Sequence, residues 1–141
     1  MIAGPLRGPA VQAWLDELRT RLDREAETLR AQHPACAVRV HSHAVGERTE
    51  FQGRTVILEV TLEDGEAIAL SVTAAYLTTL PRLDADVSWS HGNVEAATWD
   101  AASSTEWTVA TGEHVAQLER DLPRLLAAVQ GGITRGRPRR P

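Results

Sequence analysis

The sequence contains no lysine, and all 15 of its basic residues are arginines. Chemistry that depends on a P-loop lysine, a Schiff-base lysine or a lysine general base is therefore excluded. There is one cysteine, Cys36, so no intrachain disulfide can form and we expect a reducing, cytoplasmic location. The motifs G-x-G-x-x-G, G-x-S-x-G, H-E-x-x-H and C-x-x-C are missing too, and no local pattern names an enzyme.

Long apolar runs are also missing. The longest, such as residues 125–129, are far shorter than the ~20 residues that cross a bilayer. Residues 1–9 lack the basic and apolar regions of a signal peptide, so we expect no membrane association. A length of 141 residues suits one domain, which we place at 1–132, followed by a disordered arginine-rich tail at 133–141.

Apolar residues recur at helical spacing near both ends of the chain. The first stripe, between Pro9 and Pro34, contains Val11, Trp14, Leu15, Leu18, Leu22, Ala26 and Leu29. The second stripe follows Thr111 and contains Val115, Leu118, Leu122, Leu125, Leu126 and Val129. Pro123 predicts a kink or break near Asp121 in this second helix, and Gly131 and Gly132 predict its end.

Between the two helices the apolar period changes to two, which is typical of strands. The first three predicted strands are 36–45, 55–62 and 66–76. A weaker hairpin follows, formed by 85–91 and 94–100 around a turn at Gly92-Asn93. After a polar loop at 101–105 we expect a short strand at 106–110. A three-residue loop ending at Gly65 pairs Val60 with Ile68 and matches apolar faces, whereas a two-residue turn would not.

These elements predict an α+β fold with an antiparallel sheet of five to six strands, in the order α-β-β-β-β-β-(β)-α, and both helices on one face. The other face would carry small, mixed residues: Thr55, Ile57, Thr61, Ala67, Ala69, Ser71 and Thr73. Two helices need not cover both faces of such a sheet. The second face is therefore a candidate for association with a protein partner or with a second copy.

Two histidines on one strand are the most suggestive chemical pair. Residues two apart on a strand point the same way, about 6–7 Å from each other, so His41 and His43 are able to share a zinc ion if a third ligand arrives. His91 is the candidate third ligand, with Asp84 and Asp86 as further partners. The alternative is an ordinary polar strand face without a cofactor, and no cofactor is our expectation. Cys36 falls on the inward face, where a thiol is usually inert.

Tryptophan is the dominant aromatic residue, with four copies against one phenylalanine and one tyrosine. Trp89, Trp99 and Trp107 lie among polar residues, which is typical of a ligand-binding platform or of a protein-binding hot spot, and we favour a protein partner. The alternative is that tryptophan fills the core because other aromatic residues are scarce.

Positive charge is concentrated at the end of the chain. The stretch Arg135-Gly136-Arg137-Pro138 resembles the core of the AT-hook, a short motif whose arginines enter narrow A·T minor grooves. The resemblance implies DNA binding by Arg135 and Arg137. The rest of the chain is acidic, which does not suit a general nucleic-acid binder.

We therefore favour a non-enzymatic protein-interaction or homodimerising module. The alternatives are a DNA-associated protein that uses the AT-hook-like tail, or a metal-dependent enzyme that uses His41 and His43. We expect no membrane partner, and the sequence does not identify a ligand.

Overall fold

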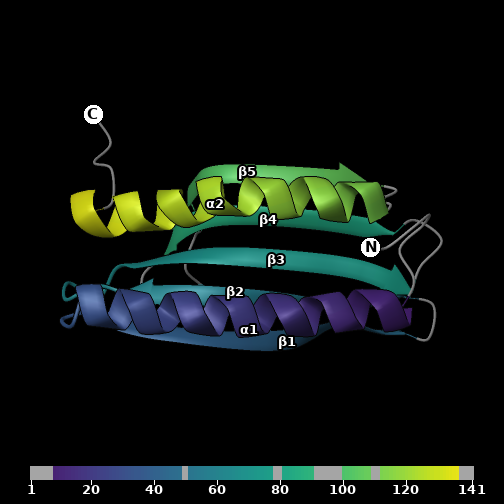
Figure 1. Cartoon of the computed structure of the whole chain (residues 1–141), viewed down its shortest axis with the longest axis horizontal. Coiled ribbons are helices and arrows are strands. Elements are labelled where there is room, and N and C mark those ends of the chain that lie inside the picture. The colour runs from purple at the N-terminus through teal and green to yellow at the C-terminus, as the bar shows by residue number, and fades with distance from the viewer. Residues whose placement is uncertain (1–7, 49–50, 78–80, 91–99, 109–111, 137–141) are drawn as a thin grey trace.

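The structure is a computed structural model that describes residues 8–48, 51–77, 81–90, 100–108 and 112–136 (Figure 1). Its elements are α1 (Gly8–Gln32), β1 (Ala37–Arg48), β2 (Phe51–Thr61), β3 (Ala67–Leu77), β4 (Arg82–Ser90), β5 (Asp100–Thr108) and α2 (Gly112–Arg135). The strands form one antiparallel sheet in chain order, β1-β2-β3-β4-β5. The predicted α+β fold, with a helix on either side of an antiparallel sheet in the chain, is confirmed. No described helix is both long and apolar enough to cross a membrane.

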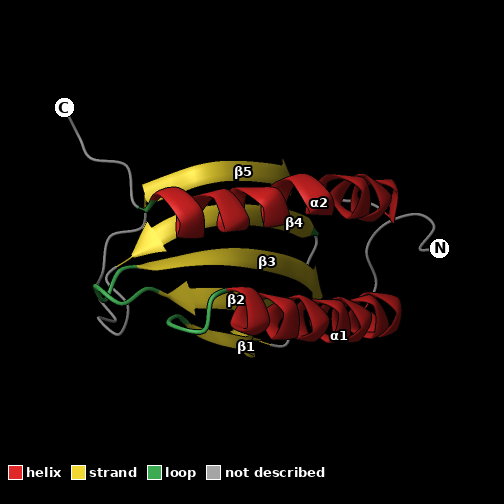
Figure 2. Cartoon of the chain, turned by 60° about the vertical axis from the view of Figure 1, so that its left-hand side comes forward, coloured by secondary structure: helices red, strands yellow, loops and turns green. Residues whose placement is uncertain are grey.

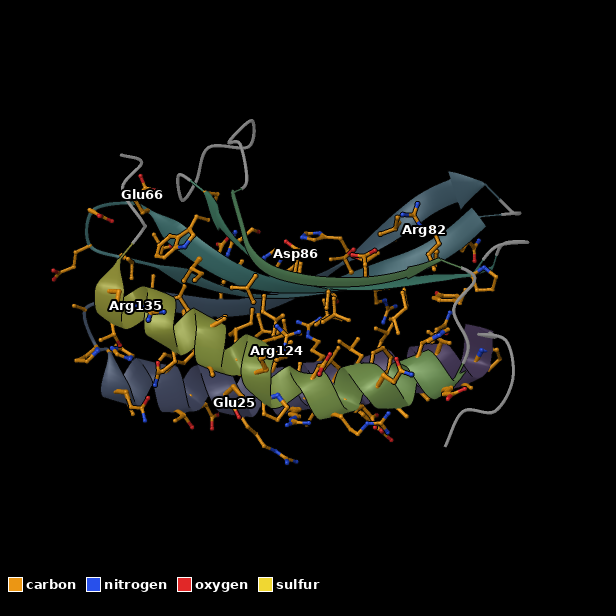
Figure 3. The ribbon with its side chains drawn as sticks, turned by 90° about the horizontal axis from the view of Figure 1, so that it is seen from above. Glu25, Glu66, Arg82, Asp86, Arg124 and Arg135 are labelled. Atoms are coloured by element: carbon orange, nitrogen blue, oxygen red, sulfur yellow. The ribbon has the colours of Figure 1, made fainter. Side chains whose placement is uncertain are left out.

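Both helices pack on the same face of the sheet (Figures 1 and 2). Helix α1 contacts β1, β2 and β3, and α2 contacts β3, β4 and β5. Seen from the side, the helices lie against one face, and none of the described helices covers the other face (Figure 3). The molecule is therefore a two-layer structure.

The core lies between these two layers. Each helix contributes one apolar stripe, and alternate residues of β2, β3 and β4 point toward those stripes. The central leucines are almost completely buried: Leu15, Leu22, Leu58, Leu70, Leu83, Leu118 and Leu125. Burying each such side chain contributes about 1.5–3 kcal/mol, so the apolar stripes determine which face of the sheet the helices cover.

The turn between β2 and β3 has the predicted geometry. Val60 pairs with Ile68, and Leu58 pairs with Leu70. Gly65 has a φ of 87°, the left-handed region that a glycine adopts without strain. Its amide donates a hydrogen bond to the Leu62 carbonyl at 3.0 Å. The predicted three-residue loop and its register are confirmed.

The prediction for the last part of the sheet is partly wrong. Strand β5 runs through Ser103 and Thr105, which we expected in a polar loop, and these residues pair with Val87 and Ala85 of β4. A strand needs only backbone hydrogen bonds to its neighbour, so a polar sequence at a sheet edge gives no apolar alternation to detect. The predicted turn at Gly92-Asn93 lies outside the described residues.

The second helix differs from the prediction at two points. It continues without interruption through Pro123, whose ring is exposed. It also continues past Gly131 and Gly132 to Arg135, and ends where Gly136 adopts a φ of 76° and donates a hydrogen bond to the Gly132 carbonyl at 2.7 Å. Gly132 lies against Ile68 and Trp89, so a side chain there would meet the sheet. Its function is close packing and not helix termination.

This packing predicts opposite outcomes for two neighbouring glycines. Both Gly131→Ala and Gly132→Ala gain helix propensity, but a methyl group at 132 would meet the buried Ile68 and Trp89, whereas one at 131 meets only the flexible end of Arg135. We expect Gly132→Ala to be less stable than Gly131→Ala by about 1–3 kcal/mol. Urea unfolding measures the difference, and equal stabilities would contradict the assigned contact.

Candidate functional site

The candidate site is the face of the sheet opposite the helices, called here the open face. Its central residues come from four strands, three from each: Arg39, His41 and His43; Thr55, Ile57 and Glu59; Ala69, Ser71 and Thr73; Asp84, Asp86 and Ser88. Alternation places them there, because their neighbours in each strand point into the core. Figure 3 shows Asp86 and Arg82 on this side of the sheet.

The strand register arranges these residues in rows across the sheet. One row runs from His41 through Ile57 and Ser71 to Asp86, and the next runs from His43 through Thr55 and Thr73 to Asp84. Imidazoles therefore occupy the β1 side of the open face and carboxylates occupy the β4 side. Because neighbouring strands are about 4.8 Å apart, the ends of each row are separated by about 14 Å. A histidine and an aspartate of one chain do not meet.

The two histidines contact each other directly. His41 Nδ1 and His43 Nε2 lie 2.6 Å apart, and the rings meet edge to face with centroids 4.6 Å apart. His41 Nε2 is buried without a hydrogen-bond partner. Burial first, then the positive charge of Arg39, the neighbouring His43 and the more distant Arg19, lower the pKa of His41, and Glu59 opposes them. The neutral form of His41 is therefore favoured.

Asp86 is the counterpart at the other side of the open face. It is partly buried, and burial raises the pKa of its carboxyl group, while a hydrogen bond from Ser88 acts in the opposite direction. The ionised carboxylate is therefore less stable here than in water, and it favours a further donor. The sequence indicated Asp86 only as a further partner for a metal ion. Its position in the same row as His41 depends on the pairing of β3 with β4, which the sequence did not predict.

Two polar contacts hold the middle of the open face, whereas the buried hydroxyl group of Ser90, further along β4, has no hydrogen-bond partner among the described residues. Arg39 pairs with the almost buried Glu59 at 2.7 Å, and the hydroxyl groups of Thr55 and Thr73 lie 2.7 Å apart. Exposure varies along the strands. Ala69 and Ser88 are 0% and 2% exposed, whereas the rows that contain Ser71 and Thr73 are partly exposed. The accessible part of the open face is thus the part that carries the histidines and aspartates.

The structure brings together only two of the three predicted metal ligands. His41 and His43 are adjacent, and His91 lies outside the described residues. Within the ranges that the structure describes, no three His, Cys, Asp or Glu side chains form a group that would hold a metal ion. The nitrogens that face each other in the histidine pair are already engaged, so metal binding would require both rings to turn.

The predicted tryptophan cluster is only partly described. Trp89 is 2% exposed and packs in the core, as the alternative interpretation of these residues expects. Trp107 pairs with Leu83 of β4 in the sheet, and Trp99 lies outside the described residues. Sequence reasoning missed Trp14, whose indole N–H donates to Glu119 at 2.7 Å across the two helices. Its position in an apolar stripe gave no sign of this polar contact.

The remaining candidates lie away from the open face. Arg135 ends α2, and Arg137 lies outside the described residues, so the AT-hook resemblance stays a prediction. Cys36 is partly buried beside the core. Burial and then the nearby Glu63 raise the pKa of its thiol, which disfavours the reactive thiolate.

The lowered pKa of His41 predicts how stability changes with pH. Since the folded chain favours neutral His41, its contribution is complete above the ordinary histidine pKa of about 6.5 and is lost as the pH falls below it. We expect the free energy of unfolding to fall between about pH 7.5 and about pH 5, and to fall less in His41→Gln. Urea unfolding across this range tests the difference, and parallel curves would contradict it.

Comparison with known proteins gives no external guide to this site. No family model matches the chain, and neither a curated protein nor a solved structure matches it. The function must therefore be inferred from the residues and their geometry.

Proposed function

We propose that this chain is a non-enzymatic protein-interaction module that forms a homodimer through the open face of its sheet. The observation that carries the proposal is the arrangement of the two central rows. Each row has an imidazole at its β1 end, small or medium side chains in its middle and a carboxylate at its β4 end.

This arrangement is complementary to itself. Stacked sheets lie about 10 Å apart with nearly aligned strands. If a two-fold axis runs parallel to the strands between β2 and β3, β1 of one copy lies over β4 of the other. His41 then faces Asp86 of the second copy, and His43 faces its Asp84. Ile57 faces Ser71, and Thr55 faces Thr73. Every pair occurs twice, as a symmetric interface requires.

The charge distribution selects this axis. A two-fold axis perpendicular to the strands would instead place β1 against β1 and β4 against β4. Asp84 and Asp86 would then face carboxylates of the second copy, and like charges that face each other cost free energy. The parallel axis gives the partly buried Asp86 an additional donor from outside its own chain.

The side chains at the centre permit close approach. Ser71 and Thr73 of β3 and Thr55 of β2 are small, and the two threonine hydroxyl groups already bond to each other. Each hydroxyl therefore has one hydrogen-bond partner before association, which lowers a common cost of burying a polar face. The DNA-binding and metal-dependent alternatives remain predictions without a comparable supporting contact.

A charged side chain at the centre of the face provides the first test. We expect the wild-type chain to be a dimer in light scattering at about 100 µM, and Ser71→Arg to be a monomer, because a guanidinium group would hold the sheets apart. Ala127→Arg, on the exposed side of α2, is the matched control and should remain dimeric. A monomeric wild-type chain, or equal effects of both variants, would contradict the proposal. Circular dichroism confirms that each variant is folded.

An exchange of charges tests the orientation of the two copies. His43→Glu places two acidic residues opposite each other, and Asp84→Arg places two basic groups opposite each other. We expect each variant alone to dimerise about tenfold more weakly than the wild type. A mixture of the two should form a heterodimer, since the introduced glutamate of one copy then meets the introduced arginine of the other. A mixture that remains monomeric would contradict the parallel axis while leaving the open face itself to the first test.

A further inference from the structure

A second site lies on the opposite side of the molecule, between the two helices. Helices α1 and α2 start at the same end of the sheet and run side by side (Figures 1 and 2). At their C-terminal ends they are bridged, since Gln130 contacts both Gln32 and His33 at 2.6 and 3.1 Å. Toward their N-terminal ends a groove of about 490 Å³ separates them.

The lining of this groove combines an apolar base with two acidic groups. It includes Ala13, Trp14 and Glu17 from α1, and Val115, Ala116 and Glu119 from α2. A smaller extension of about 270 Å³ continues toward Leu18, Arg21 and Leu122. The volume lies within the range of about 300–1,000 Å³ that small ligands and side chains occupy in proteins.

One hydrogen bond holds the polar part of the groove in place. Trp14 Nε1 donates to Glu119 Oε1 at 2.7 Å, which links the two walls. Trp14 is 7% exposed, so packing as well as this bond fixes the orientation of its indole. The ring and the carboxylate are thus held in place before any ligand arrives, and little conformational entropy is lost on binding.

The charge of the groove defines the ligand. Glu17 and Glu119 bring a carboxylate from each helix, and no arginine of the described ranges lines the main part of the groove. The nearest lining cation is Arg21, in the extension. Among the described residues, neither glutamate forms an ion pair across the groove. Two carboxylates beside the accessible edge of an aromatic ring favour a planar cation, which lies against that edge and donates to the carboxylate oxygens.

We propose that the groove between α1 and α2 binds an arginine side chain presented by an extended segment of a partner protein. The guanidinium group donates to Glu17 and Glu119 and lies beside the indole of Trp14, and the methylene stem packs on Ala13 and Ala116. The remaining volume accommodates small residues on either side of the arginine. This site is independent of the open face and of the proposed dimer.

Titration with a short peptide tests the site in the full-length chain. The probe is acetyl-Gly-Arg-Gly-amide, and its neutral counterpart contains citrulline in place of arginine. We expect saturable binding of the arginine peptide with a Kd in the ~0.1–1 mM range and no binding of the citrulline peptide. The NMR signal of the Trp14 indole N–H, assigned with Trp14→Phe, should shift during the titration.

Matched variants separate this site from general attraction to an acidic protein. Glu17→Gln and Glu119→Gln should each weaken binding by about fivefold or more. Glu27→Gln removes the same charge from an exposed position of α1 outside the groove and should leave the Kd unchanged. Ala116→Leu fills the groove and should abolish binding in a folded chain. The absence of saturable binding, or equal weakening by Glu27→Gln, would overturn the proposal.

Discussion

The burial of one face of the sheet by two helices is the interaction on which the rest of the structure depends. Alternate residues of the strands must contact the apolar stripes of α1 and α2. This requirement fixes the register of β2 and β3, since a shift by one residue would turn the apolar side chains away from the helices. It also determines the composition of the open face, because the strand residues that alternate with the core residues point there.

Both proposed sites are consequences of the same layering. A sheet covered by helices on one side leaves part of its second face accessible, and two helices packed on the same side leave a groove between them. The open face carries histidines and aspartates at opposite sides, whereas the interhelical groove carries glutamates beside a tryptophan. The two surfaces point away from each other. A chain of this shape is therefore able to use both at once.

Sequence periodicity predicted the elements that bury apolar residues and missed those that do not. The two helices and the β2–β3 turn follow from spacing and from Gly65. Strand β5 was misassigned in part, because an edge strand with a polar sequence has no alternation. The end of α2 was misplaced because Gly132 serves packing against Ile68 and Trp89, a contact between residues far apart in the chain. The partners of His41 and Trp14 likewise required the register and the helix pairing.

The order of the strands has a consequence for how quickly the chain folds. Each strand pairs only with its neighbours in sequence, so no pair of strands in the sheet joins segments that are far apart in the chain. Short loops close with little loss of entropy, and folds dominated by such nearby pairings reach the native state faster than those with crossover connections. The sheet can therefore grow from the β2–β3 hairpin outward in both directions, while each helix covers the strands nearest to it as they form.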